Sequence, residues 1–589
     1  MQAESRSESM SVVVPSARGD LWIAAGTFAS LFLLYWFGRC LSFGGADSPQ
    51  HVLSAVTWGV SWPPGYPLYV MLGHLASLLP GLPAGNVSAL SGLLHALAAA
   101  VFFLTLRRLS LKPSSALVAT GLMALSPLFW YYSELGEVRA LNDLLAIGAA
   151  YWAVAWTQGR RPTALLALAA CLGLGISHHP TFVFILPAIG YWLWSHEAWP
   201  RGRPLARAIG VLLLFIALPY LILGLRLDLG SPAYNLTSAA GLLDMPGLFL
   251  RKDLGGPLRV VAGRGFLDFG SFDFARFWQH LRWFLSSAYG ALTPLGLPLA
   301  ALGLAVFWRK RRQELVFWGL WLGAAALCYI VMGSQQLKLH NPEFAYAIAA
   351  RFHLLPLIAA FAVAGLGADW LLERFGRGWG WALLAATAGV ALAWHPISLR
   401  RSGFIMDYAR EMIRSSGPSD MIIMDSDSST FAMLYLDLVE HAAGDRVLLV
   451  PSLFGYPPYQ RWLARRNPGL NTPPDFVMDW SQWVRLNPSR ALYAEAESWN
   501  ELRGFFPGSA PSGVLIRASE QPPAPEVLRA GIQRLLDWRA VSHRDLYPFS
   551  PEMELVNTYR LMLNWGLQSL PQAGDPALAD RLRQRLNES

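Results

Sequence analysis

The sequence is poor in charged residues and in cysteine, and each scarcity narrows the class of protein. Charged residues make up 15% of the 589 residues and hydrophobic residues 54%, whereas soluble domains carry about a quarter charged residues. The three cysteines, Cys40, Cys171 and Cys328, lie within or at the ends of apolar runs, so they imply no disulfide framework and no metal site. The shortage of charge, with repeated apolar runs of roughly 18 residues or more, indicates a polytopic membrane protein.

Two other features are missing from the sequence. The polar N-terminal segment is not followed by a short apolar core with a small-residue cleavage site, so the apolar run at 21–41 is expected to be a retained first span. No repeated halves are found, although transporters are usually built from such repeats. The absence of repeats therefore argues against a transporter.

The apolar runs predict a mainly α-helical protein with about eleven transmembrane helices, because a helix needs about 20 residues to cross the hydrocarbon. The expected spans lie at 21–41, 86–106, 115–133, 141–158, 163–177, 180–196, 206–226, 282–308, 314–333, 351–373 and 380–397. Basic clusters occupy every second loop, near residues 107–112, 160–161, 201–207, 309–312 and 374–377. By the positive-inside rule, these clusters lie on the cytoplasmic side and place the N-terminus in the cytoplasm. We therefore attribute the net charge of +8 to membrane topology and not to nucleic-acid binding.

The composition changes near residue 399, where short strand-like segments begin to alternate with helical ones, as in α/β proteins. Asp425 and Asp427 follow the first of these strands, and capping of the next helix is the favoured interpretation. We expect a cytoplasmic tail at 1–20, a transmembrane helical domain at 21–398, an extracytoplasmic α/β domain at 399–520 and a helical C-terminal tail at 521–589.

The predicted topology brings a set of polar residues to the outer side of the membrane, where such residues usually line a cavity or pathway. A carboxylate can take the proton of an acceptor hydroxyl, and Arg or His can neutralise a departing phosphate. The set therefore fits transfer from a lipid-linked phosphate donor. Its members are Asp47 and Gln50 in the first outer loop, Glu137 and Arg139 in the second, His178 and His179 at the third turn, and Lys338 and Arg351 before the tenth span.

Each of these residues also has a purely structural interpretation. Asp47 precedes a helical stretch at 50–60 and could only cap it. Glu137 could simply pair with Arg139 at the interface, a contact that is usually worth little. Two adjacent histidines point in different directions on a helix, so a paired metal site is weakly supported. Trp62 and Tyr66 fit an interfacial aromatic belt or a platform for stacking on a sugar.

Several segments resemble a family of polytopic membrane proteins that includes the animal endoplasmic-reticulum O-mannosyltransferase of plexin and receptor IPT domains. The segment WPPGYPLY at 62–69 is the most specific element of the resemblance. The other matching residues are Asp47-Ser48, Phe129-Trp130, Glu137-Val138, Leu141-Asn142, His178-His179, Arg351-Phe352 and Leu355-Pro356. The likeness is clearest over residues 21–190.

The resemblance implies a GT-C glycosyltransferase that uses a polyprenyl- or dolichyl-phosphate sugar and inverts the anomeric carbon. Asp47 and Glu137 occupy the positions of the acidic residues that this class carries in its first and second outer loops. The sequence departs from the family at Gln50, where a second acidic residue is common, and at Arg139, where an aromatic is common. Without that carboxylate, the first loop offers no support for a divalent metal, and the sequence leaves metal dependence open.

The working hypothesis is an inverting transferase that moves a hexose, with mannose favoured, from a polyprenyl-phosphate carrier to an extracytoplasmic protein or glycan, most readily a Ser or Thr hydroxyl. Asp47 is the expected base and Glu137 orients a substrate. His178, His179 and Arg351 hold the phosphate, with Arg139 and Lys338 in reserve, while Gln50, Trp62 and Tyr66 contact substrate. Two alternatives remain, a transporter or flippase and a non-catalytic membrane scaffold. The missing disulfides favour a bacterial inner membrane with a periplasmic site.

Overall fold

The fold is described from a computed structural model of the chain. The structure describes residues 17–61, 65–228, 273–308, 310–336, 342–376, 378–394, 403–455, 457–498, 502–538, 546, 550–570 and 575–589. Long helices dominate the first two thirds of these residues. A small sheet with surrounding helices follows, and we refer to residues 403–589 as the C-terminal region.

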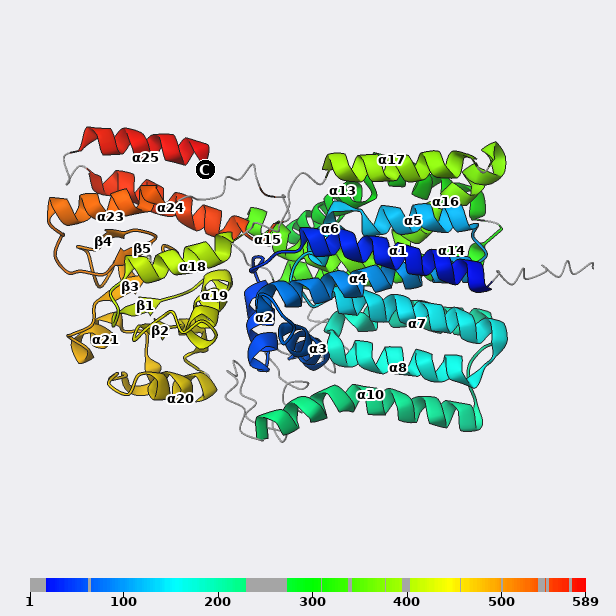
Figure 1. The fold of residues 1–589 in the computed structure, drawn as a ribbon, viewed down its shortest axis with the longest axis horizontal. Helices are drawn as coiled ribbons and strands as arrows, with labels where there is room; N and C mark the ends of the chain where they lie inside the picture. The colour runs from blue at the N-terminus through cyan, green and yellow to red at the C-terminus, as the bar shows by residue number, and fades with distance from the viewer. Residues whose placement is uncertain are drawn as a thin grey trace, which may run out of the picture.

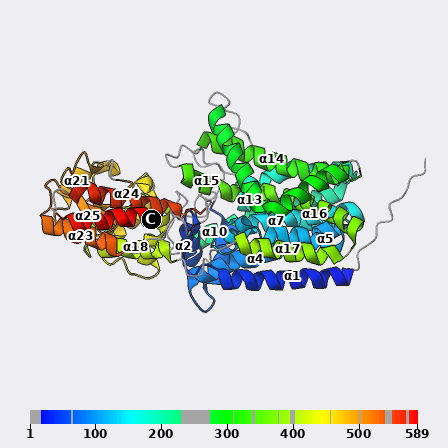
Figure 2. The ribbon, with the colours of Figure 1, turned by 90° about the horizontal axis from the view of Figure 1, so that it is seen from above.

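The long helices of the first part run side by side, and the C-terminal region lies beyond one end of them (Figures 1 and 2). Their sequences are predominantly apolar on all sides, as is typical of helices that cross a membrane or lie in a buried core. The helices are α1 (Ala17–Gly38), α4 (Pro83–Arg108), α5 (Pro113–Ala124), α6 (Pro127–Ser133), α7 (Arg139–Gly159), α8 (Pro162–His178), η1 (Pro180–Ile185), α9 (Leu186–Ser195), α10 (Gly202–Asp228), α13 (Phe274–Phe307), α14 (Arg312–Gln336), α15 (Pro342–Ala350), η4 (Arg351–His353), α16 (Leu354–Phe375) and α17 (Gly378–Trp394).

The protein is a polytopic helical membrane protein, although the expected number of about eleven spans is not confirmed. Six described helices are long and apolar enough to cross a membrane: Arg18–Gly38, Pro83–Arg108, Gly202–Arg226, Phe274–Val306, Arg312–Val331 and Ala345–Phe375. α5 and α6 would form a seventh span, bent by 67°. The other expected spans fall on helices that are shorter or less apolar, which is why length and composition do not identify them as spans.

The basic loops gather at the end of the helix bundle that lies away from the C-terminal region. Contacts between helices that are distant in sequence hold this end together. They are Arg107 with Asp20 at 2.8 Å, Lys112 with Glu373 at 3.3 Å, Arg108 with Gln158 at 3.0 Å and Arg160 with the carbonyl of Glu197 at 3.0 Å. The loops that the positive-inside pattern groups together therefore lie close together in the structure.

Two short helices, α2 (Ser48–Thr57) and α3 (Pro67–Ser77), lie between the bundle and the C-terminal region (Figure 1). Pro49 occupies the first turn of α2, and Pro67 begins α3. Proline suits these positions because a helix leaves its first amide groups without internal partners. Gly65 and Tyr66 both have positive φ, 92° and 45°, and turn the chain into α3. Glycine adopts this conformation readily, whereas tyrosine rarely does.

The C-terminal region contains a five-stranded mixed sheet in the order β2-β1-β3-β5-β4. The first three of these are parallel, while β5 runs antiparallel to both β3 and β4. β1, β2 and β3 are buried throughout, as expected for parallel strands covered on both faces. The strands are β1 (Met421–Ile423), β2 (Val447–Leu449), β3 (Leu492–Ala494), β4 (Ala510–Ser512) and β5 (Leu515–Arg517).

Helices cover this sheet and extend to the end of the chain. α18 packs on α19, α23 packs on β4, and α24 packs on α25. The helices are α18 (Phe404–Ser415), α19 (Asp427–Leu438), η6 (Pro451–Leu453), α20 (Pro457–Arg466), η7 (Pro474–Phe476), α21 (Trp480–Leu486), α23 (Pro525–Asp537), α24 (Met553–Ser569) and α25 (Pro576–Glu588). The division of the chain at residues 20, 398 and 520, and the side of the membrane on which each part lies, stay predictions.

Candidate active site

The first and third outer segments meet around the ring of Tyr66. This ring lies 5.2 Å from the ring of His51, 5.9 Å from that of His178 and 5.6 Å from that of His179, measured between centroids. Tyr66 therefore lies among the histidines, two of which are expected to bind the phosphate. The turn formed by Gly65 and Pro67 holds it there.

Asp47 forms an ion pair with Arg351, with 2.6 Å between Oδ2 and Nη1. The Asp47 side chain is 23% exposed and that of Arg351 10%. Burial raises the pKa of Asp47, but nearby positive charge, chiefly that of Arg351, outweighs this effect and holds the pKa below its ordinary value. Asp47 is thus an accessible carboxylate that stays ionised at neutral pH.

The capping interpretation of Asp47 is wrong. Asp47 is the N-cap residue of α2, but its side chain makes no capping hydrogen bond. Its Oδ2 atom accepts from Arg351 instead. Oδ1 has no hydrogen-bond partner among the described residues, so it can accept a hydrogen bond from a substrate.

Glu137 is buried between two nitrogen-bearing side chains. Its Oε2 lies 3.4 Å from Nε2 of His51, and its Oε1 lies 3.7 Å from Nε of Arg139. The backbone amide of Glu137 donates to Oγ of Ser91, which in turn donates to the Glu137 carbonyl. The expected pairing with Arg139 is therefore present, but it is buried and belongs to a larger set of contacts.

His51 is a member of the site that the sequence analysis did not identify. It lies on α2 four residues after Asp47, the spacing that places two side chains on the same face of a helix. Burial lowers the pKa of His51, and the neighbouring carboxylates of Glu137 and Asp47 only partly oppose this shift. The imidazole is therefore neutral at neutral pH, and its Nδ1 lies 3.0 Å from Oγ of Ser61.

The two adjacent histidines have different partners, as their alternating directions predict. Nε2 of His178 lies 2.9 Å from the carbonyl of Val138, next to Glu137. Nδ1 of His179 accepts from the backbone amide of Thr181 and lies 2.7 Å from its hydroxyl. His178 thus ties the end of α8 to the second outer loop, while His179 stabilises the turn into η1.

Arg139 and Arg351 lie beside one aromatic ring. Their guanidinium carbons are 4.1 Å and 5.3 Å from the centroid of the Phe352 ring. Arg351 keeps a buried Nε–H that has no hydrogen-bond partner among the described residues. Two guanidinium groups this close leave positive charge and unused donors at one place, which suits an anionic group.

The remaining predicted site residues have mixed outcomes. Gln50 is fully buried on α2, and neither atom of its amide has a hydrogen-bond partner within the described ranges. Trp62 and Lys338 lie outside the described residues. Among the residues that are described, no three His, Cys, Asp or Glu side chains are grouped so that they could hold a metal ion.

The C-terminal region contacts the first outer loop directly. The carboxylate of Glu552 accepts a hydrogen bond from the amide of Gly45 at 2.9 Å and another from the hydroxyl of Tyr131 at 2.6 Å. A Cβ atom added at Gly45 would lie 2.6 Å from backbone atoms of Pro551 and Glu552. The absence of a side chain at Gly45 therefore permits this close approach.

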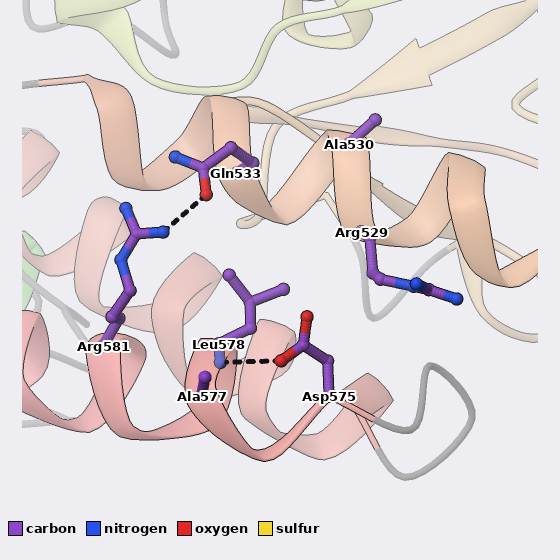
Figure 3. A pocket seen from close by; sticks show the side chains of 7 residues that line it. All are labelled: Arg529, Ala530, Gln533, Asp575, Ala577, Leu578 and Arg581. Carbon is purple, nitrogen blue, oxygen red and sulfur yellow. Dashed lines mark hydrogen bonds between the residues drawn. The ribbon is translucent and has the colours of Figure 1, made fainter.

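A separate hollow of about 290 Å³ lies on the outer helices α23 and α25 (Figure 3). Within it, Arg581 donates to Gln533 at 2.7 Å, and the amide of Leu578 donates to Asp575 at 3.1 Å (Figure 3). None of its lining residues belongs to the group around Asp47. Its polar side chains are partly paired with one another, so we assign it no part in the chemistry.

The residues around Asp47 also lie in the part of the chain that is similar to known proteins. Residues 47–201 match the family model of the protein O-mannosyl-transferase TMEM260 N-terminal domain. The protein O-mannosyl-transferase TMEM260 of Mus musculus is 25% identical over 493 residues, which cover 78% of this chain and 67% of the mouse protein. This chain is a relative of the protein O-mannosyl-transferases. It is an enzyme of the glycosyltransferase class, which sets aside the transporter and scaffold alternatives.

A second relative matches over a shorter stretch. The protein O-mannosyl-transferase tmem260 of Dictyostelium discoideum is 27% identical over 264 residues, or 40% of this chain and 31% of that protein. The match therefore spans about a third of the Dictyostelium relative. The matched family segment includes Asp47, Glu137 and both histidines, while Arg351 lies beyond it.

Two solved structures show a partial likeness to this chain. ArnT from Cupriavidus metallidurans, bound to undecaprenyl phosphate, has a TM-score of 0.45 and 13% identity, covering 84% of this chain and 97% of that chain. The oligosaccharyltransferase AglB from Archaeoglobus fulgidus, in complex with an inhibitory peptide and a dolichol-phosphate, has a TM-score of 0.46 and 13% identity, covering 81% of this chain and 70% of that chain.

Proposed function

We propose that this protein is an inverting GT-C glycosyltransferase that moves a hexose, with mannose favoured, from a polyprenyl-phosphate carrier to a Ser or Thr hydroxyl of a protein. The observation that carries the proposal is the Asp47–Arg351 pair, in which an accessible carboxylate adjoins a guanidinium with an unused buried donor. The names of the mouse and Dictyostelium relatives support mannose as the sugar and protein as the acceptor.

In the proposed reaction, the acceptor hydroxyl attacks C1 of the sugar on the face opposite the phosphate. The new C–O bond forms as the bond from C1 to the phosphate oxygen breaks, and Oδ1 of Asp47 receives the hydroxyl proton. The products are an O-glycoside of inverted configuration and the polyprenyl phosphate. A single displacement needs one base and one site for the leaving phosphate, and Asp47 and Arg351 supply them.

The donor phosphate would bind beside Phe352, where Arg351 and Arg139 lie close together. Their guanidinium groups provide fixed donors that favour the negative charge developing on the leaving phosphate. His178 and His179 lie beside the ring of Tyr66 and would line the donor site together with it. Lys338 stays a predicted reserve group, since it lies outside the described residues.

Glu137 and the substrate-contacting residues would position the reactants. Glu137 is close to His51 and Arg139, so it fixes both side chains and orients the sugar or the acceptor. Both hydrogen-bonding groups of the buried Gln50 amide lack a partner among the described residues, and Tyr66 would offer a ring face to the substrate. Trp62 stays a predicted stacking residue. The reaction as written requires no metal ion or cofactor.

We place the site on the extracytoplasmic side, because α2, which directly follows Asp47, lies at the end of the bundle opposite the basic loops (Figure 1). This orientation also puts the C-terminal region outside the cytoplasm. The composition favours a bacterial inner membrane with a periplasmic site, while the two curated relatives come from eukaryotes. The partners are then a lipid-linked sugar, an extracytoplasmic protein and membrane lipids.

The test is transfer of radiolabelled mannose from polyprenyl-phosphate mannose to a mixture of extracytoplasmic proteins, with the enzyme in nanodiscs. We expect the wild type to label protein and Asp47→Asn to lose the activity. As a matched control, Asp407→Asn removes an exposed carboxylate near Arg410 in the C-terminal region and should transfer at the wild-type rate. Full activity of a folded Asp47→Asn variant would contradict the proposed base.

A further inference from the structure

The start of α19 in the C-terminal region is fixed against the segment that leads into Asp47. The amide of Ala46 donates to Oγ of Ser428 at 2.9 Å. The ring of Phe43 packs edge-on against that of Tyr435, with 4.9 Å between centroids. α2 and α19 pack along each other. These contacts join two segments that are far apart in the sequence, since Ser428 comes 382 residues after Ala46.

The hydrogen bond between Ala46 and Ser428 brings two aspartates to the same place. Asp47 directly follows Ala46, and Asp427 directly precedes Ser428. Asp427 is exposed, whereas Ser426 and Ser428 on either side of it are buried. Ser428 also donates to Glu554 at 2.9 Å, which fixes the backbone next to Asp427. An exposed carboxyl group is thus held at the start of α19, next to the segment that carries the proposed base.

Asp427 does not serve as the helix cap that the sequence suggests. α19 begins at Asp427 with Ser426 as its N-cap, and no side-chain capping bond is made there. Although the residue is exposed overall, desolvation of its carboxyl group and the negative charge of Asp47 together raise the pKa of Asp427 to about 7, against the opposing effect of Arg351. The charged groups that act on Asp427 are Asp47, Arg351, Asp425, Glu497 and Glu554.

A second observation points to a ligand at this junction. Gln50 lies on α2, the helix that packs against α19, and is fully buried. Both its amide oxygen and its amide nitrogen lack a hydrogen-bond partner among the residues described. An amide side chain can both donate and accept. It therefore complements a peptide backbone, which carries one donor and one acceptor per residue.

We propose that Asp427 is an acceptor-binding residue, which accepts a hydrogen bond from the acceptor polypeptide next to the hydroxyl that Asp47 deprotonates. The assignment rests on the proposed function. In this assignment the membrane helices supply the base and the phosphate site, and the C-terminal region supplies Asp427. The acceptor class that fits is a polypeptide with a Ser or Thr flanked by a free amide N–H or a basic side chain.

The test compares kinetic constants for a pool of synthetic Ser- and Thr-containing peptides with those for polyprenyl-phosphate mannose. We expect Asp427→Asn to raise the KM for peptide about tenfold, equivalent to about 1.4 kcal/mol, and to leave the KM for donor unchanged. Asp427→Glu keeps the charge and should restore most of the affinity. Asp475→Asn, at an exposed position of the same region, should behave as wild type.

The pH dependence supplies a readout that a structural role would not change. The carboxylate form binds the acceptor, so kcat/KM for peptide should fall as the pH is lowered through about 7, and Asp427→Asn should abolish this limb. If Asp427→Asn kept a wild-type KM for peptide and the same fall of kcat/KM at low pH, the role of Asp427 would be overturned, while the proposed function would stand. Absence of transfer by the wild type to both peptides and proteins would overturn the proposed function itself.

Discussion

Replacing Asp47 separates its chemical role from its structural one. At 2.6 Å, two unit charges attract by on the order of 6 kcal/mol at an effective dielectric constant of about 20, before the cost of desolvation. Removing one partner of a buried pair typically costs about 3–5 kcal/mol. Because Asp47 is partly exposed, we expect Asp47→Ala to lower the free energy of unfolding by about 3 kcal/mol, the lower end of that range.

Asp47→Asn should cost less, about 1 kcal/mol, because the amide oxygen can still accept a hydrogen bond from Arg351. Both variants lack the base, so kcat should fall by about 10²–10⁴ in each. Donor affinity should be unchanged or higher in Asp47→Asn, since Arg351 is no longer neutralised by a carboxylate.

The assays are single-turnover transfer, binding of labelled polyprenyl-phosphate mannose, and thermal unfolding in nanodiscs. Asp407→Asn is the matched control, because Asp407 lies 4.0 Å from Arg410 on the surface and such pairs contribute about 0–1 kcal/mol. Equal loss of stability in Asp47→Asn and Asp47→Ala, or a wild-type kcat in either, would refute the reasoning.

Three further predictions concern other parts of the site. Glu137→Gln should reduce kcat/KM by about tenfold or more, measured by initial rates, because His51 and Arg139 lose the carboxylate between them. The saturating transfer rate should stay flat from about pH 8 to pH 5, because the lowered pKa keeps Asp47 ionised in that range; a fall near pH 6 would show a base with a higher pKa. Gly45→Ala should lower the unfolding midpoint and raise the protease sensitivity of the C-terminal region, at a cost of about 1–3 kcal/mol. Gly190→Ala, where no atom lies within 4 Å of the added Cβ, should leave both properties unchanged.

Much of the active-site constellation could be predicted from the sequence, since outer loops and family-like motifs are local signals. Asp47, Glu137 and the two histidines each lie in a short loop that alternating spans place on one side. Their assembly into one group is a consequence of the fold. The partner of Asp47 is 304 residues away, and no local pattern indicates which basic residue that partner would be.

The capping prediction for Asp47 failed because tertiary contacts override local preference. Asp is common before a helix, and Asp47 does occupy the N-cap position. Arg351 attracts the same carboxylate with a full charge, which the partial charge of a helix N-terminus does not match. The sequence analysis also missed His51, because a single histidine on a short helix does not by itself indicate a functional site.

In the C-terminal region the sequence suggests strands at 420–425, 446–450, 492–495 and 514–517, and β1, β2, β3 and β5 fall on these segments, whereas β4 was missed. β4 (Ala510–Ser512) is three residues long, contains Pro511 and lies at the edge of the sheet. Proline is tolerated at an edge but argues against a strand when the sequence is read alone. The contact of Glu552 with Gly45 spans 507 residues and was equally beyond sequence reasoning.

The most direct test of the central claim is the position of the donor phosphate. A cryo-EM structure of the Asp47→Asn variant with bound polyprenyl-phosphate mannose would locate it. We expect the phosphate within hydrogen-bond distance of Arg351, with C1 of the sugar facing residue 47. A phosphate bound among the basic loops near Arg107 and Lys112, at the opposite end of the bundle, would contradict the proposed site and its chemistry.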